Sequence, residues 1–319
     1  MTYGLATVTI GGRPQAVMVR GDDYVPLSHW AETRDLPALL AHWQDAAGRF
    51  PEWAADDRAF ASAASFSDAD VRAPYRPVQV FCTGANYKKH VVGLIMGDPS
   101  MRTAEHENLS PEERKRQVED MMDKRAKALP FVFLKLPSCV VGPRDDVVLP
   151  RNVEKPDWEL ELGVVIGRRA HHVSAAEAMD YVAGFAVVND VTAREHIFRR
   201  DGSAIGADWL SGKCFPTFLP FGPMIVPKEQ VADPYDLTIK LKVNGKTYQD
   251  ESTSDMMASI ERQIEYLSDR VVLEPGDLIC TGSPYGNGSA FGVFLKAGDV
   301  MEGSISGLGT QRNRCVAEA

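Results

Sequence analysis

The sequence predicts a mainly β protein of the α+β class, with a β-roll or barrel as its main body and a small N-terminal domain. From Pro130 onward, short apolar runs alternate with turn residues at short intervals, as in an antiparallel all-β architecture. Only two segments there have a convincing helical pattern, at 174–181 and 255–268. Strands that alternate with helices would instead predict a parallel sheet, so a roll fits better.

The N-terminal part has a different pattern from the main body. The first 30 residues contain three short alternating runs with turns between them, which predicts a small antiparallel meander. Residues 35–64 are rich in Ala and Leu and predict two short helices. Pro74 and Pro77 precede the next apolar strand. We therefore place the domain boundary there, between residues 1–75 and 76–319.

The segment 96–129 predicts a very polar helical insertion. Between Arg102 and Lys127, seven basic residues balance seven acidic ones. Ser110 and Glu113 have the spacing of a capping box, and Pro130 ends the helix. A thin apolar stripe along it consists of Val118, Met121, Met122 and Leu129. This pattern is typical of a solvated connecting helix or of a lid that closes over a pocket.

Composition excludes several classes of protein. The formal charge is −9, and an acidic surface disfavours binding to nucleic acid or to anionic membranes. No apolar stretch approaches the roughly 20 residues of a membrane-spanning helix, and the first residues do not resemble a signal peptide. The five cysteines include no C-x-x-C pair, which disfavours a disulfide framework or a thiolate zinc site. We expect a cytoplasmic protein.

The segment around Glu159 and Glu161 carries the strongest chemical signal. In a strand, alternate residues share a face, so these two carboxylates lie on one side and lead an apolar strand into the core. Two like charges at the entrance to a core require a nearby cation. Either a divalent metal with oxygen ligands or a structural ion-pair network can supply it. Asp190, which ends another apolar run, is either a third oxygen ligand or a helix cap.

Seven motifs follow one another along the chain: Asn86-Tyr87-x-x-His90, Phe133-Leu-Lys135, Glu159-Leu-Glu161-Leu-Gly-Val-Val-Ile-Gly167, Asn189-Asp190-Val-Thr-Ala-Arg194, Gly212-Lys213, Thr281-Gly-Ser-Pro284 and Ile305-Ser-Gly-Leu-Gly309. In this order they resemble the fumarylacetoacetate hydrolase family over residues 78–316. The resemblance implies a β-roll, usually dimeric. It also implies a small anionic oxo-acid or diketone as substrate.

The resemblance also implies roles for individual residues. Glu159, Glu161 and Asp190 match the ligands of Mg²⁺, Mn²⁺ or Ca²⁺. His90 matches the histidine that activates water, and Lys213 matches the lysine that stabilises a developing enolate or oxyanion. The matches to substrate-binding positions are Tyr87, Lys135, Arg194 and Thr281. The predicted reaction is metal-dependent hydrolysis of a C–C bond in an acylpyruvate or β-diketo acid, within the catabolism of aromatic compounds.

Two positions depart from the family pattern. Hydrolytic relatives often carry a Glu three residues after the histidine, where this chain has Gly93, and Ile197 replaces a Gln. Three explanations stay open: a carboxylate from the insertion replaces that Glu, His90 acts alone, or the enzyme decarboxylates, hydrates or isomerises a 2-oxo acid instead. The candidate carboxylates are Glu105, Glu107 and Glu113. A binding protein without catalytic activity is disfavoured because the carboxylates and Lys213 are present together.

Two further signals have simpler interpretations. The stretch from Thr281 to Gly288 is rich in glycine, but it lacks the spacing of a phosphate-binding loop. Cys214 adjoins Lys213, which would lower the pKa of its thiol, although its residue type favours a buried and inert thiol.

Overall fold

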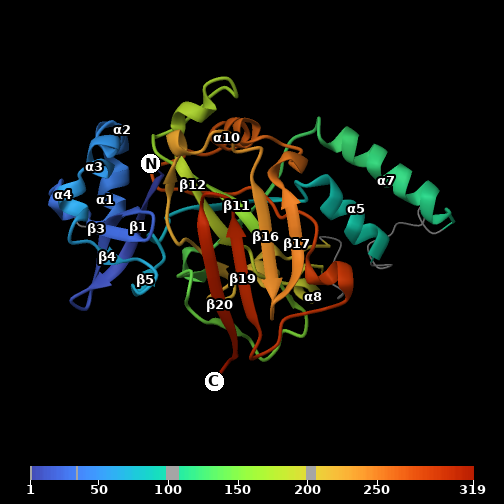
Figure 1. Ribbon diagram of the computed structural model, residues 1–319. Helices are drawn as coiled ribbons and strands as arrows, with labels where there is room; N and C mark the ends of the chain where they lie inside the picture. Colours follow the sequence, from blue (N-terminus) through green and yellow to red (C-terminus); the bar gives the residue numbers. More distant parts are fainter. Residues whose placement is uncertain (1, 34, 98–107, 199–205) are drawn as a thin grey trace.

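The computed structural model describes residues 2–33, 35–97, 108–198 and 206–319 (Figure 1). Within these ranges, the strands form three sheets of five or six strands and two two-stranded pairs. The pairs are β10 (Pro156–Asp157) with β13 (Thr192–Ala193) and β8 (Val140–Val141) with β14 (Leu219–Pro220). The predicted mainly β class is therefore confirmed.

The N-terminal sheet has the predicted meander at its centre. Its strand order is β4 (Ala64–Ser65), β3 (Asp23–Pro26), β2 (Arg13–Arg20), β1 (Tyr3–Ile10) and β5 (Val71–Arg72). Four short helices follow β3 instead of the two predicted, because glycine, proline and capping residues interrupt the Ala-rich stretch. They are α1 (Leu36–Ala41), α2 (Trp43–Ala47), α3 (Phe50–Ala54) and α4 (Asp57–Phe60). Asp35 and Asp56 accept backbone N–H groups at the starts of α1 and α4.

This sheet contacts the main body through backbone pairing. Leu5 and Ile225 exchange two hydrogen bonds of 2.8 Å each, and in Figure 1 the N-terminal elements lie to one side of the larger sheets. The family-like part of the chain thus begins after a unit with its own sheet. The exact domain boundary at residue 75 stays a prediction.

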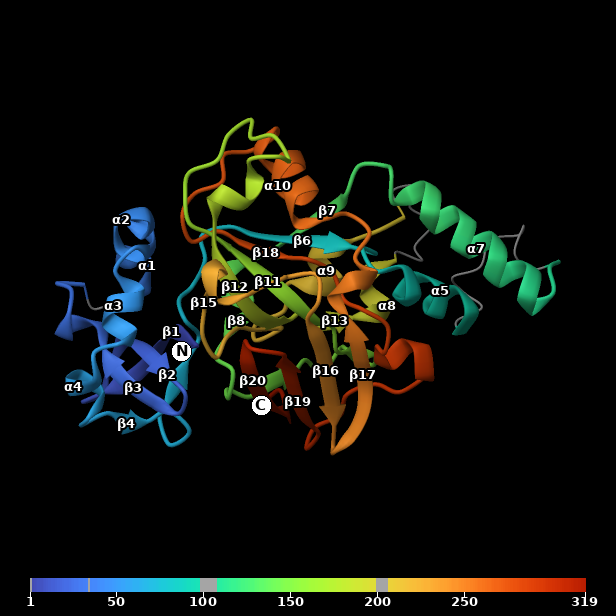
Figure 2. The ribbon, with the colours of Figure 1, turned by 45° about the horizontal axis from the view of Figure 1, so that its top comes forward.

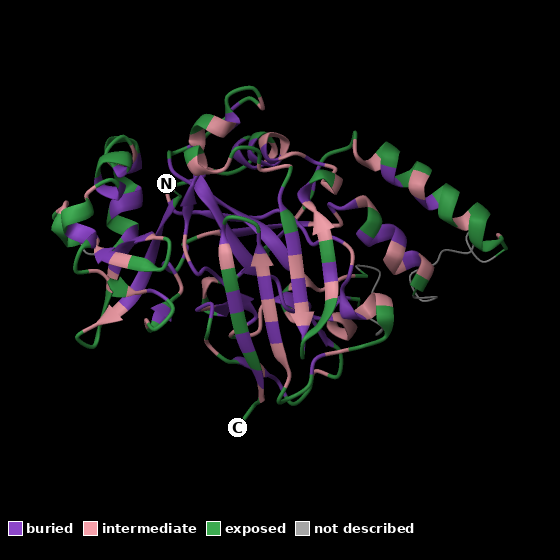
Figure 3. Ribbon diagram, viewed as in Figure 1, coloured by how far each residue is buried: buried purple, intermediate pink, exposed green. Residues whose placement is uncertain are grey.

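The central sheet has six strands and mixed direction. Its order is β15 (Val226–Pro227), β12 (Val182–Asn189), β11 (Leu160–Ile166), β18 (Leu278–Cys280), β6 (Val80–Gly84) and β7 (Phe131–Lys135). Neighbours are antiparallel except for β18 and β6. Every residue of β11 and β12 is buried (Figure 3). Apolar residues therefore cover both faces of these strands, as continuous apolar runs predict.

The C-terminal sheet packs against the central one (Figure 2). Its order is β17 (Lys246–Ser252), β16 (Thr238–Val243), β19 (Val300–Ile305), β20 (Gly309–Ala317) and β9 (Val147–Leu149). Asn244 and Gly245 both have positive φ, as the predicted Asn-Gly hairpin between β16 and β17 requires. The core between the two sheets includes Leu160, Leu162 and Leu241.

Few helices accompany these sheets. They are α5 (Lys88–Gly97), α7 (Pro111–Arg125), α8 (Arg194–Ile197), α9 (Trp209–Lys213) and α10 (Ile260–Ser268). Short 3₁₀ turns are η1 (Leu27–His29), η3 (Pro137–Cys139), η4 (Ala178–Tyr181), η5 (Lys228–Gln230), η6 (Thr253–Asp255) and η7 (Gly288–Phe291). The predicted helix at 174–181 is wrong, because only one 3₁₀ turn forms there before β12 begins. No helix of the described ranges is both long and apolar enough to span a membrane.

The insertion forms the predicted capped helix, α7. Ser110 and Glu113 make the capping box. Val118 and Met122 are buried against α5, whereas Leu129 lies beyond the helix and is 69% exposed. Since the apolar stripe already packs on a neighbouring helix, the described part fits a connecting helix better than a lid. Residues 98–107, with Glu105 and Glu107, lie outside the described residues.

Candidate metal centre and active site

Three carboxylates predicted from the sequence meet at the ends of β11 and β12. Glu159 and Glu161 alternate along one strand, so they point to the same side. Asp190 follows β12, and its backbone N–H donates to the carbonyl of Glu159 at 2.8 Å. One oxygen from each carboxylate lies within 4.8 Å of the other two. The pairing of β11 with β12 therefore brings together residues about 30 positions apart in the chain.

Two buried lysines contact this cluster. Lys213, the last residue of α9, places its Nζ 2.5 Å from Oε2 of Glu159 and 2.5 Å from Oδ2 of Asp190. Lys135, at the end of β7, donates to the other oxygen of Asp190 and to the carbonyl of Val191. The alternative role of Asp190 as a helix cap is wrong, because α8 begins at Arg194 and has Ala193 as its N-cap.

Arg194 joins the cluster to a fourth carboxylate, Asp157. Its Nε donates to Asp157 at 2.8 Å, and its Nη2 donates to Glu159 at 2.6 Å. The Arg194 side chain is 19% exposed, compared with 3% for Lys213 and 0% for Lys135. Of these three cations, Arg194 is therefore the one that an anion from solvent reaches first.

Glu161 differs from its neighbours because no cationic side chain of the described residues bonds to it. Its Oε2 accepts only the backbone N–H of Gly282, at 2.9 Å. Burial raises its pKa well above the ordinary value, and the nearby Asp190 and Glu159 raise it further. Burial also acts to raise the pKa of Glu159, but Arg194 and Lys213 outweigh it and lower that pKa.

The charges and donors of this cluster fit a hard divalent cation. Four buried carboxylates face three cationic side chains, so one carboxylate, Glu161, lacks compensation. Carboxylate oxygens are the ligands that Mg²⁺ and Mn²⁺ prefer. Glu159, Glu161 and Asp190 are the residues that would hold such an ion.

The glycine-rich loop after β18 donates a hydrogen bond to each of three carboxylates. Gly282 N–H donates to Glu161, the Asn287 side chain to Glu159 at 3.4 Å, and Gly288 N–H to Asp157 at 2.6 Å. A Cβ on Gly288 would overlap the carbonyl of Val293 and crowd Asp157. Glycine is therefore required where this loop approaches the strand.

Asp157 and Asn287 are site residues that the sequence interpretation missed. Asp157 is fully buried, and it accepts backbone N–H groups from Trp158, Gly288 and Ser289 besides the Arg194 bond. The sequence contained a signal for Asp157, since it precedes Glu159 by two residues and therefore shares its strand face. Nothing in the sequence alone placed the Asn287 loop beside that strand.

His90 lies in the first turn of α5 and is 6% exposed. Burial lowers its pKa to about 4; Arg194 and Lys213 act in the same direction, and Glu159 opposes them. The ring is therefore neutral near pH 7 and able to accept a proton. Asn287 also interacts with it, but no carboxylate of the described residues hydrogen-bonds to His90.

The position of the missing glutamate is filled by an aromatic ring. A Cβ on Gly93 would overlap the ring of Tyr285, which packs against the backbone there. Glu113, the candidate replacement that lies within the described residues, holds Ser110 in the exposed capping box instead. At the second position that differs from the family pattern, the side chain of Ile197 packs against Gly212, which directly precedes Lys213.

Three of the predicted substrate-binding residues are buried in the protein. Lys135 bonds to Asp190, and the Thr281 hydroxyl donates to the carbonyl of Leu162 at 2.9 Å. Tyr87 is fully buried beside Thr281 and close to Glu161. Their contact with a substrate stays a prediction.

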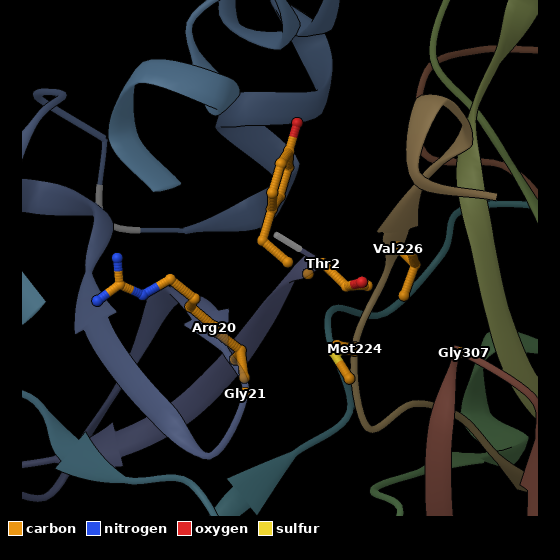
Figure 4. A pocket seen from close by; sticks show the side chains of 9 residues that line it. Thr2, Arg20, Gly21, Met224, Val226 and Gly307 are labelled. Carbon is orange, nitrogen blue, oxygen red and sulfur yellow. The ribbon is translucent and has the colours of Figure 1, made fainter. Parts of the chain in front are cut away.

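A separate cavity of about 510 Å³ lies between the N-terminal sheet and β15 (Figure 4). It is lined by Thr2, Tyr3, Gly4, Val19, Arg20, Gly21, Met224, Val226 and Gly307. Its charged side chain, Arg20, pairs with Asp57 at 2.7 Å. The cavity shares no residue with the carboxylate cluster.

The comparison that decides the family is a match over residues 79–316 to the model of the fumarylacetoacetate hydrolase C-terminal domain. The chain belongs to the fumarylacetoacetate hydrolase family. Its relatives include hydrolases, isomerases and tautomerases, which supports an enzymatic role for the chain.

Two relatives have similar degrees of identity but different names. Human mitochondrial oxaloacetate tautomerase FAHD2B is 45% identical over 189 residues, which is 59% of this chain and 59% of that protein. The 2,4-didehydro-3-deoxy-L-rhamnonate hydrolase of Sphingomonas sp. is 45% identical over 188 residues, 58% of this chain and 64% of that protein. Each match therefore covers less than two thirds of the relative.

A solved structure supports the same fold over the whole chain. Maleylpyruvate hydrolase from Sphingobium sp., in complex with manganese(II) and pyruvate, superposes with a TM-score of 0.70. The two chains are 24% identical, and the match covers 99% of this chain and 100% of the other. The fold therefore includes the N-terminal elements as well as the family domain.

Proposed function

We propose that this member of the fumarylacetoacetate hydrolase family is a divalent-metal-dependent tautomerase or isomerase of a small 2-oxo acid. The observation that carries the proposal is the environment of His90. It is a buried, neutral base beside the carboxylate cluster, and the ring of Tyr285 occupies the place of the glutamate that hydrolytic relatives pair with it. Because no carboxylate of the described residues orients its ring toward a water, this base suits direct proton transfer at carbon.

Glu159, Glu161 and Asp190 would hold Mg²⁺ or Mn²⁺. When bound, this cation supplies Lewis-acid polarisation of a 2-oxo acid carbonyl. The manganese and pyruvate bound by the maleylpyruvate hydrolase of the same fold support this choice of metal and ligand class.

The chain's own residues account for the remaining steps. Arg194, partly exposed, is suited to bind the substrate carboxylate. His90 accepts a proton from the carbon next to the carbonyl, and the Lys213 ammonium stabilises the negative charge that develops on the enolate oxygen. Protonation of the enolate oxygen by the His90 imidazolium or by solvent then gives the enol, and the reverse of both proton transfers returns the keto form.

The second candidate is hydrolysis of a C–C bond in a 2,4-dioxo acid, the reaction predicted from the sequence. The 45% identity to the rhamnonate hydrolase favours it. Hydrolysis also requires a water that a base activates. Within the described residues, the amide of Asn287 lies beside His90, and no carboxylate orients its ring.

Product analysis with two substrates separates the candidates. With Mg²⁺ in heavy water, we expect faster exchange of the C3 protons of oxaloacetate and faster decay of its enol, both observed by proton NMR. A 2,4-dioxo acid such as acetopyruvate should exchange deuterium without yielding acetate and pyruvate. Release of those two products at a higher rate than exchange would favour hydrolysis. The Glu161→Gln variant is the control for metal-dependent turnover in both reactions.

A further inference from the structure

Two cysteines outside the carboxylate cluster lie on segments that are neighbours in space. Cys139 ends the turn that follows β7, and Cys214 directly follows α9. The Cys139 Sγ lies 4.0 Å from the carbonyl oxygen of Lys213, and the Cys214 Sγ lies 3.7 Å from that of Leu134. Each sulfur therefore lies against the other's segment, and each thiol shifts the pKa of the other.

Cys214 is accessible, contrary to the sequence-based expectation of a buried, inert thiol. It is partly exposed, whereas Cys139 is fully buried. The exposure arises because α9 ends at Lys213 and leaves the next side chain at the edge of the sheet beside β7. A reagent from solvent can thus reach one member of the pair, with the second directly behind it.

The surroundings favour a thiolate at the accessible sulfur. The neighbouring Cys139 thiol lowers the pKa of Cys214 to about 6 despite partial burial, and the N–H of Leu136 and the ammonium of Lys135 act in the same direction. The neighbouring Cys214, together with burial, raises the pKa of Cys139. The proton therefore stays on Cys139, and Cys214 has the nucleophilic form.

The other cysteines of the chain provide an internal contrast. Cys82 and Cys280 are register partners on the parallel strands β6 and β18, and both are fully buried. Cys315 is also fully buried. Two cysteines thus lie near each other twice in this protein, but only the Cys139–Cys214 pair includes a cysteine that is partly exposed.

We propose that Cys139 and Cys214 form a reversible disulfide when the protein meets a peroxide. The Cys214 thiolate attacks one peroxide oxygen and the O–O bond breaks, which gives a sulfenic acid and a hydroxide; the hydroxide takes from solvent the proton that Cys214 had lost on ionisation and leaves as one water. The Cys139 thiol then attacks the Cys214 sulfur, the S–S bond forms, and the sulfenic hydroxyl leaves as a second water. In sum, two thiols are oxidised and one H₂O₂ is reduced to two waters; a dithiol reductant reverses the change.

The bond would join the two segments that carry the buried lysines. Lys213 directly precedes Cys214, and Lys135 lies four residues before Cys139. Both ammonium groups bond to Asp190. The proposal does not depend on the proposed function, since it concerns thiol chemistry that can be measured without a substrate.

The experiment compares thiols of the full-length protein by mass spectrometry. Under reducing conditions, brief iodoacetamide treatment should label Cys214 about tenfold faster than Cys82, Cys280 or Cys315, because thiolate character and exposure control reactivity. After hydrogen peroxide, peptides containing Cys139 and Cys214 should be linked, with two hydrogens lost. Dithiothreitol should restore both free thiols.

Two variants make the outcome decisive. In Cys139→Ser, peroxide should leave Cys214 as a sulfenic acid that dimedone traps, because the resolving thiol is gone. In Cys280→Ser, which removes one member of the buried pair, the 139–214 link should still form. Labelling of Cys214 no faster than Cys82, or peroxide treatment of the wild-type protein that yields no 139–214 link, would overturn the proposal. Both of these results come from the wild-type chain and do not depend on the folding of a variant.

Discussion

The central and C-terminal sheets share one core but differ in where their charged residues lie. In the C-terminal sheet, burial alternates along β16, and its charged residues pair at the surface, as Lys240 does with Asp250 at 2.9 Å. In the central sheet, β11 and β12 are buried on both faces, and their charged residues lie inside at the strand ends. The first arrangement exposes charge to water, whereas the second requires every buried carboxylate to have a partner.

The buried charged residues of the central sheet form the candidate site of the protein. A buried carboxylate is costly unless cations or N–H groups compensate it. Asp157, Glu159 and Asp190 have such partners within the chain, and Glu161 has a single backbone N–H. An additional cation beside Glu161 would complete the compensation of this cluster. Variants of site residues can be compared with control variants at residues outside the site, most of which lie in the C-terminal sheet.

The largest effect is expected for Lys213→Met. It leaves Glu159 and Asp190 without the ammonium that bridges them, so the free energy of unfolding should fall by about 3–5 kcal/mol, as for other broken buried pairs. The matched variant Lys240→Met removes an exposed pair and should change stability by less than about 1 kcal/mol. Denaturant titration measures both. Equal small changes would mean that the buried lysine is not a structural partner of the carboxylates.

The next effect is expected for Asp157→Asn, which keeps the side chain's shape and removes its charge. Arg194 loses one of the two carboxylates that fix its orientation, so kcat/KM for an anionic 2-oxo acid should fall about ten- to a hundredfold. Asp250→Asn at the surface should leave it unchanged. In an Arg194→Gln background, Asp157→Asn should have little further effect, because the orienting role acts through the arginine. Full additivity of the two changes would contradict that role.

A smaller effect is expected for Gly93→Ala. The added Cβ overlaps the Tyr285 ring and forces it to move, which should cost about 1–3 kcal/mol of stability. Gly48→Ala, where a Cβ meets nothing within 4 Å, should cost less than about 1 kcal/mol or even stabilise the chain. Thermal unfolding compares the two variants. Similar values would show that Tyr285 does not constrain position 93.

The smallest effect is expected in the pH dependence of kcat/KM. His90 acts as a base only when neutral, and burial lowers its pKa to about 4 from an ordinary 6.5. With saturating Mg²⁺, kcat/KM should therefore stay constant as the pH falls through 6.5 and should decrease only near pH 4. A decrease centred between pH 6 and 7 would show that the ring is not desolvated in the active enzyme.

The sequence predicted much of this arrangement because its signals are local. Alternating or continuous apolar runs indicated the strands, the Asn244-Gly245 turn indicated a hairpin, and the spacing of Glu159 and Glu161 placed both on one strand face. The helix at 174–181 was wrong because helical periodicity in a short segment does not decide between one 3₁₀ turn and a full helix.

The remaining site features depend on contacts between distant segments. The Asn287 loop approaches Asp157 from about 130 residues away, and Tyr285 fills the space at Gly93 from about 190 residues away. Neither contact leaves a periodic pattern in the sequence. The exposure of Cys214 likewise follows from where α9 ends beside β7.

The central claim is that Glu161 completes a site for a divalent cation. Isothermal titration calorimetry with Mn²⁺ tests it most directly, on the wild-type chain, Glu161→Gln and the surface control Glu302→Gln. We expect one Mn²⁺ site in the wild-type and control proteins and at least a hundredfold weaker binding (about 2.7 kcal/mol) in Glu161→Gln. Equal affinity in all three proteins, or no Mn²⁺ binding by the wild-type chain, would contradict it.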